Sequence, residues 1–195
     1  RHRDGSADTA LTAELERHGA HWQGFTQELA EDDAADRLFD AASSHFGRAP
    51  ALIVNNASLF RDGDVMALSA EQLSRHLAVN LTTPTLLARR MGAHGGAIVN
   101  ILDQRVRQPV PDQIAYSLSK QALWQATRTL AVALAPAVRV NAVAPGLSLP
   151  TEEYEPGRME RMAGLMPLER LPAPAEIADA VLYLARAECV TGQTI

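Results

Sequence analysis

The chain has 195 residues, of which 47% are hydrophobic and 21% charged, a composition typical of a single soluble globular domain. Its formal net charge of −5 offers no basic surface to nucleic acid or to an anionic membrane. Cys189 is the only cysteine, which excludes an internal disulfide and favours a reducing, cytoplasmic location. No apolar stretch approaches the roughly 18 residues of a membrane-spanning helix, and no secretory signal is recognised at the start.

Helical patterns alternate with short apolar runs along the whole chain. Gly19 and Gly47 stand where the first two helical patterns end, and Ser69 with Gln72 forms a capping box. Residues 150–170 are rich in Pro, Glu, Arg and Met and predict a loop with one short helix. In chain order the predicted elements are a helix at 6–18, a strand at about 21–26, a helix at 31–45, a strand at 51–54, a helix from 69 to about 91, a strand at 97–101, a helix from about 113 to 135, a strand at 138–144, a helix from 174 to about 186 and a strand beginning in "TGQTI".

Strands that alternate with helices across short turns predict an α/β fold, with a parallel sheet covered on both faces. Such sheets bind their ligands beyond the carboxyl ends of the strands. Three polar features stand at strand ends: "NNAS" at 55–58, Asp103, and "PGLS" at 145–148. We therefore expect these three features to converge on one site.

Tyr116 and Lys120 lie four residues apart on a predicted helix, so both side chains project from one face. Lys120 is the only lysine, and a randomly placed lysine would follow a tyrosine at this spacing with odds of about 3 in 195. A nearby ammonium favours the phenolate and lowers the tyrosine pKa, which suits general acid–base chemistry. The alternative is an ordinary tyrosine beside an ordinary lysine on the surface.

The segment "YSLSK" (116–120) resembles the Tyr-x-x-x-Lys signature of the short-chain dehydrogenase/reductase family. "NNAS" is similar to the family's Asn-Asn-Ala-Gly turn, Asn80 in "AVNL" to its mid-helix asparagine, and "RVNAVAPGLS" (139–148) to its Pro-Gly segment. "LPAPAEIADAVLYLA" resembles the penultimate helix, and "VTGQTI" the start of the last strand. The resemblance covers the whole chain as one domain, 1–195.

This resemblance implies a Rossmann-type doubly wound parallel sheet and hydride transfer from a nicotinamide dinucleotide. Tyr116 would deliver a proton, while Lys120 would hold the nicotinamide ribose and lower the pKa of Tyr116. Asn80 would support a water and proton path, or would simply bond neighbouring backbone. The cofactor would be lined by residues of the two turns and by the lysine: Asn55, Asn56, Ala57, Lys120, Pro145, Gly146, Leu147 and Ser148.

Asp103 departs from the general family pattern, which has serine at this position. An ionised carboxylate only accepts hydrogen bonds, so it suits a substrate that presents N–H groups. Asp103, Ser58 and "PGLS" together resemble the pteridine reductase branch, which includes dihydromonapterin and dihydrofolate reductases. There, the aromatic residue matching Phe60 stacks on the pterin ring, so Ser58, Phe60, Asp103 and Tyr116 would contact the substrate. The alternatives are a turn or helix-cap role for Asp103 and a core role for Phe60.

The first residues bear on the choice of cofactor. Arg3 and His2 fall where the family meets the adenosine ribose, and an arginine there favours the 2′-phosphate of NADPH. Glu28 and Leu29 match the family's residues near the adenine. The glycine-rich turn that holds the pyrophosphate is absent, so we expect a fold that lacks its first strand, that turn and the end of its last strand.

The resemblance thus implies an NADPH-dependent reductase of a dihydropterin or dihydrofolate, forming the tetrahydro product, such as tetrahydrobiopterin. One alternative is a short-chain reductase of an unrelated carbonyl. Another is a non-catalytic, ligand-sensing protein on the same scaffold. The resemblance also implies a homotetramer, with the helices at about 70–91 and 113–135 pairing between subunits. No metal, nucleic acid or membrane partner is expected.

Overall fold

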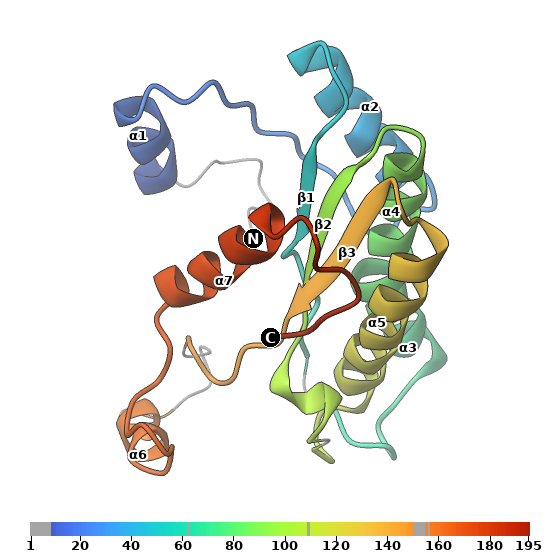
Figure 1. Cartoon of the computed structure of the whole chain (residues 1–195). Helices are drawn as coiled ribbons and strands as arrows, with labels where there is room; N and C mark the ends of the chain where they lie inside the picture. Colours follow the sequence, from blue (N-terminus) through green and yellow to red (C-terminus); the bar gives the residue numbers. More distant parts are fainter. Residues whose placement is uncertain (1–8, 62, 109, 150–154, 156) are drawn as a thin grey trace.

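Three parallel strands form the centre of the computed structural model, which describes residues 9–61, 63–108, 110–149, 155 and 157–195. The sheet order is β1-β2-β3, so strands that follow each other in the sequence are also neighbours in space (Figure 1). Their bounds are Leu52–Asn55 for β1, Gly96–Ile101 for β2 and Val138–Val143 for β3. The α/β prediction with a parallel sheet is confirmed.

Three helices cover one face of the sheet: α2 (Ala34–Phe46), α4 (Thr83–Gly92) and α5 (Ile114–Ala133) (Figure 1). Their apolar side chains and those of the strands form one buried cluster, which removes this face from water. The buried members of this cluster are Phe39, Ala88, Met91, Ile98, Ala131, Val138 and Val140.

The long predicted helix after Ser69 is built from three segments that follow without a break: α3 (Ala70–Leu77), a π-helical turn η1 (Ala78–Thr82), and α4. Ser69 accepts a hydrogen bond from the Gln72 backbone, and Gln72 accepts one from Ser69, so the predicted capping box is present. π-Helical turns concentrate at functional sites, and this one carries Asn80.

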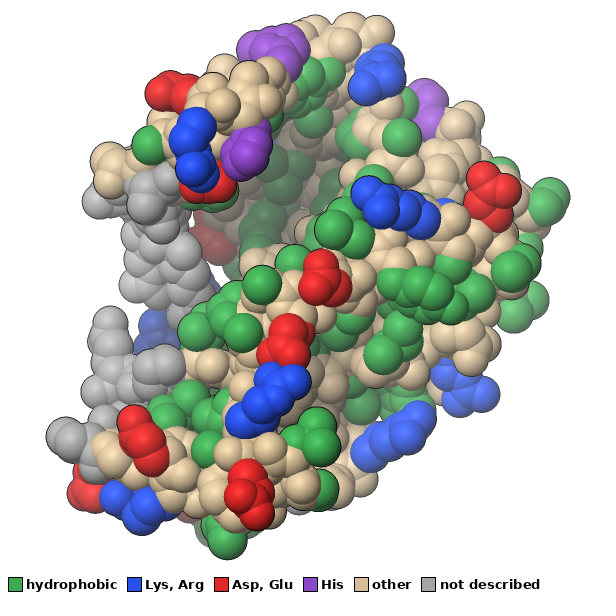
Figure 2. Space-filling view, turned by 60° about the vertical axis from the view of Figure 1, so that its left-hand side comes forward, with side chains coloured by type: hydrophobic (Ala, Val, Ile, Leu, Met, Phe, Trp, Pro, Cys, Tyr) green, Lys and Arg blue, Asp and Glu red, His purple; other side chains and the backbone are tan. Residues whose placement is uncertain are grey.

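The other face of the sheet is covered mainly by α7 (Pro174–Arg186), whose Leu184 packs against Val99 and Val143. α1 (Thr9–Arg17) and α6 (Arg158–Ala163) lie farther out on this side (Figure 1). The molecule is hollowed between the segment that carries α1 and the body with α7 (Figure 2). Leu52 and Val54 of β1 consequently remain 38% and 40% exposed, so β1 is less covered than a doubly wound sheet predicts.

Gly95 precedes β2 and Gly96 begins it, and both have a positive φ that favours glycine. Gly96 has φ +124°, which L side chains rarely adopt, and a Cβ at this position would lie 2.4 Å from the carbonyl oxygen of Ala51. The glycine pair therefore lets β2 enter the sheet close against the residue that precedes β1.

Two strand predictions differ from the structure. Residues 21–26 form no strand, because a strand requires a hydrogen-bonded neighbour and the described residues place none beside them. The final segment only begins a strand: Thr194 forms a single parallel bridge with Ala142, supported by the bond from Ala144 N to Ile195 O (2.7 Å). The helices expected at 31–45 and 174–186 agree with α2 and α7 to within a few residues.

Candidate active site

The carboxyl end of β2 and the first turns of α5 bring the three central residues of the prediction together. The Tyr116 hydroxyl donates to Asp103 Oδ2 at 2.9 Å. Lys120 Nζ donates to the carbonyl of Ile101, the last residue of β2, at 2.7 Å, and lies 5.8 Å from the Tyr116 ring centroid. The prediction that these side chains share one site is therefore supported by direct contacts.

Asp103 also has the structural role that was the alternative interpretation. It precedes the short 3-10 helix η2 (Gln104–Val106) and caps it, since its Oδ1 accepts from Arg105 N at 2.9 Å. Arg105 Nη1 additionally donates to both carboxylate oxygens, at 3.0 and 2.8 Å. One carboxylate thus joins the turn, an arginine and the tyrosine.

Phe60 lies against the tyrosine, so two of the residues predicted to contact the substrate are neighbours. Its ring centroid is 4.8 Å from that of Tyr116, with an edge-to-face angle of 78°. The Arg105 guanidinium carbon lies 5.7 Å from the Phe60 centroid and 5.9 Å from the Tyr116 centroid. Phe60 is only partly buried and is not a member of the apolar core clusters, so the core interpretation is not favoured.

The electrostatics of the pair differ from the simple expectation. The pKa of Tyr116 is raised, first by burial, then by the negative charge of Asp103 and the hydrogen bond to it, while Arg105 opposes the rise. Burial lowers the pKa of Lys120 to about 8, and the charge of Asp103 opposes that shift. The pKa of Tyr116 is thus raised and not lowered as expected, because burial and Asp103 outweigh the opposing charge of Arg105.

Asn80 is buried in η1, and its side-chain amide is fully engaged. Its Nδ2 donates to Leu59 O and to Ser119 Oγ, both at 2.9 Å. Its Oδ1 accepts from Leu59 N at 2.8 Å and from Ser58 Oγ at 3.2 Å. The side chain thus fixes the turn that carries Phe60, and the structure gives it no direct bond to Tyr116 or Asp103.

The match to known proteins extends over nearly the whole chain. The family model described as enoyl-(acyl carrier protein) reductase matches residues 2–195. The chain belongs to the short-chain dehydrogenase/reductase family. A 3-oxoacyl-(acyl-carrier-protein) reductase from Synechocystis sp. is 31% identical, over 97% of this chain and 79% of its own length.

Two solved members of the family are similar in structure as well. FolM alternative dihydrofolate reductase from Brucella canis, in complex with NADP, is 41% identical, with a TM-score of 0.86 over 95% of this chain and 75% of that chain. The promiscuous reductase LugOII, which catalyses keto-reduction at C1 in lugdunomycin biosynthesis, is 32% identical, with a TM-score of 0.85 over 95% of this chain and 79% of that chain. The neighbours thus include both a dihydrofolate reductase and a ketoreductase.

The residues expected to line the short-chain dehydrogenase/reductase cofactor lie around the same edge of the sheet. Asn55 Nδ2 donates to Asn100 Oδ1 at 2.7 Å, which ties the start of the 55–58 turn to β2. Pro145 O accepts from Gln104 N at 3.0 Å, so the Pro-Gly segment meets the turn after Asp103. Asn56 and Ala57 are exposed, whereas Leu147 and Ser148 are partly buried.

The adenine-side predictions have less structural support. Glu28 is exposed and pairs with Arg75 Nη2 at 3.0 Å, and the Leu29 carbonyl accepts from Thr83 Oγ1 at 2.7 Å. Both contacts are within the protein, so neither tests a role in adenine binding. His2 and Arg3 lie outside the described residues, and the NADPH argument that rests on them stays a prediction.

Arg105 and Thr127 were missed from the sequence. Arg105 follows Asp103 by two residues, and a cap interpretation of Asp103 would have placed it beside that carboxylate. Thr127 bonds Asn100, which is visible only once the strands are in register. Within the described ranges, no group of three or more His, Cys, Asp or Glu side chains could hold a metal ion, and no helix there is long and apolar enough to cross a membrane.

Proposed function

We propose that this oxidoreductase uses NADPH to reduce a dihydropterin or dihydrofolate to its tetrahydro form. The observation that carries the proposal is the bond from the Tyr116 hydroxyl to the Asp103 carboxylate, beside the Phe60 ring. A tyrosine provides a proton, a carboxylate accepts from substrate N–H groups, and a phenyl ring stacks on a planar heterocycle. A simple ketone would need only the first of these three.

The residues present fit the nicotinamide end of the cofactor. Lys120 is 2% exposed, and the described residues give its ammonium one hydrogen-bond acceptor, Ile101 O. A lysine ammonium has three N–H donors, so the two others would suit the hydroxyls of a ribose. When bound, NADPH supplies the hydride.

The protein's own groups then handle the proton. Burial and Asp103 raise the pKa of Tyr116, so the hydroxyl keeps its proton at neutral pH and is the group that would pass a proton to the substrate. The hydrogen bond to Asp103 fixes the direction of the Tyr116 O–H until a substrate atom replaces the carboxylate as the acceptor of that bond. Phe60 would stack on the heterocycle, which keeps the two rings parallel and excludes water from that face of the substrate.

The test is reduction of dihydrobiopterin, dihydromonapterin and dihydrofolate by the purified protein, followed through NADPH oxidation. Turnover of at least one supports the proposal, and failure with all three refutes it. Asp103→Ser separates the carbonyl alternative, which the likeness to LugOII favours: a pterin reductase would lose most of its rate, while a ketoreductase would keep it. A protein that binds pterin but oxidises no NADPH would be the ligand-sensing alternative.

We also propose that the protein forms a homotetramer in which α3, α4 and α5 pair between subunits. A shallow apolar groove runs between the η1–α4 segment and α5, lined by Leu81, Leu86, Ala122, Ala126 and Leu130 among others. Val132 of α5 is 81% exposed. An apolar helix face of this kind suits a subunit interface.

A further inference from the structure

Arg105 is a charged side chain inside the site that the proposed mechanism does not use. It lies on η2, is 19% exposed, and pairs with Asp103, which is 16% exposed. Its Nε is buried and has no hydrogen-bond partner among the described residues. A buried guanidinium is costly without an anionic partner, so its place in the fold depends on Asp103.

The dependence is mutual, because Arg105 constrains the carboxylate as strongly. Backbone N and Nη1 of Arg105 together make three bonds to the two oxygens of Asp103. The carboxylate plane is therefore fixed, and Oδ2 faces the hydroxyl of Tyr116. Charge-assisted bonds of this kind are short and directional, which makes them suited to orientation.

We propose that Arg105 is a positioning and specificity-determining residue, which acts through Asp103 to favour substrates that present ring N–H groups. This inference rests on the proposed function and deepens it. The bonds from Arg105 hold an ionised acceptor at the site, and such an acceptor binds an N–H donor but offers no bond to a ketone oxygen.

The backbone of the turn that carries Arg105 is tied to neighbouring segments. Gln121 Nε2 on α5 donates to the Arg105 carbonyl at 3.4 Å, and Gln104 N donates to Pro145 O at 3.0 Å. The guanidinium also lies beside the Phe60 and Tyr116 rings, within about 6 Å of both centroids, where a cation is attracted to the ring face. Arg105 thus links the carboxylate to the aromatic wall of the site.

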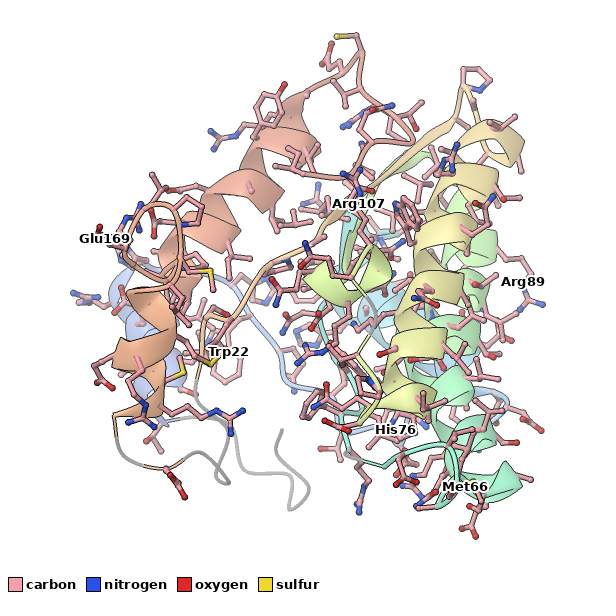
Figure 3. All side chains as sticks on the ribbon, turned by 90° about the horizontal axis from the view of Figure 1, so that it is seen from below. Trp22, Met66, His76, Arg89, Arg107 and Glu169 are labelled. Carbon is pink, nitrogen blue, oxygen red and sulfur yellow. The ribbon has the colours of Figure 1, made fainter. Side chains whose placement is uncertain are left out.

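The experiment is a double-mutant cycle in the full protein. Arg105→Met removes the charge at similar length, and it is made both in the wild type and in Asp103→Ser. Single-turnover reduction of dihydrobiopterin and NADPH affinity are measured for each variant. Arg107→Met is the matched control, since Arg107 ends the same turn but lies 5.8 Å from the Trp124 ring instead (Figure 3).

Arg105→Met is expected to lower the single-turnover rate about tenfold or more in the wild type, and less than about twofold in Asp103→Ser, with NADPH affinity unchanged. Arg105→Lys keeps the positive charge but not the planar set of guanidinium N–H donors, so its rate should lie between those of Arg105→Met and the wild type. The inference is overturned if Arg105→Met has the same single-turnover rate as Arg107→Met. It is also overturned if Arg105→Met lowers the rate by the same factor in the wild type and in Asp103→Ser, as a general structural defect would. A wild type that reduces no pterin refutes the proposed function instead.

Discussion

The side chain of Lys120 is expected to titrate near neutral pH, and it can be observed alone because it is the only lysine of the sequence. Its ammonium is buried, which lowers its pKa to about 8, and the negative charge of Asp103 acts against this shift. The group is therefore charged below pH 8 and becomes neutral as the pH rises through that value. If Lys120 must be charged to hold a cofactor ribose, kcat/KM should fall as the pH rises through about 8.

Asp103→Asn is expected to move that titration to lower pH, because it removes the charge that stabilises the ammonium. Lys120 is the only lysine, so a lysine-selective isotope label gives one side-chain NMR signal and reports the pKa without any substrate. Asp179→Asn removes an exposed carboxylate on α7 and should leave the signal unchanged. A shift to higher pH in Asp103→Asn would contradict the assignment.

Much of the site could be predicted from single residues because type and spacing fix what they can do. Tyr116 and Lys120 at i and i+4 must share a helix face, and Asp103 after an apolar run must stand at a strand end. The bond between Tyr116 and Asp103 agrees with both statements. The direction of the Tyr116 pKa shift could not be predicted, since it depends on burial, which no local pattern reveals.

At the scale of elements, a chain of buried polar side chains joins β1, β2 and α5. Asn55 Nδ2 donates to Asn100 Oδ1, Asn100 Nδ2 donates to Thr127 Oγ1 at 2.9 Å, and Thr127 Oγ1 donates to Leu123 O at 2.8 Å. Asn55 and Asn100 are partners in the parallel register. The chain therefore holds the strand end that begins the 55–58 turn at a fixed distance from α5.

Thr127→Val should destabilise the protein by about 1–3 kcal/mol, because it keeps the shape but leaves the buried Asn100 amide without its acceptor. Thr129→Val is the matched control: Thr129 makes the same bond to the carbonyl four residues earlier, Gln125 O at 3.1 Å, but is exposed. We expect it to cost less than about 0.5 kcal/mol. Urea unfolding of both variants measures the difference, and equal costs would contradict a stabilising role for the bond between Thr127 and Asn100.

Helices and strands were predicted correctly where the hydrophobic pattern was long. The prediction failed where a strand depended on a neighbouring strand. The helix that became α7 has a proline start and a full amphipathic period, so its bounds were found closely. Residues 21–26 have strand-like composition, but a strand is defined by its neighbour, and no neighbour is placed there. The Asn55–Asn100 bond likewise depends on register between strands, which lies outside any one segment.

At the scale of the whole molecule, the apolar groove between the η1–α4 segment and α5 tests the proposed assembly. Light scattering after gel filtration should give a tetramer for the wild type. Leu86→Arg places a charge in the groove and should yield smaller species, because an unpaired charge is not tolerated in an apolar interface. Leu165→Arg, at an 81% exposed position just after α6, which lies on the other side of the sheet (Figure 1), should leave the tetramer intact. A monomeric wild type would refute the assembly. A Leu86→Arg variant that is still a tetramer would show that the interface does not lie in this groove.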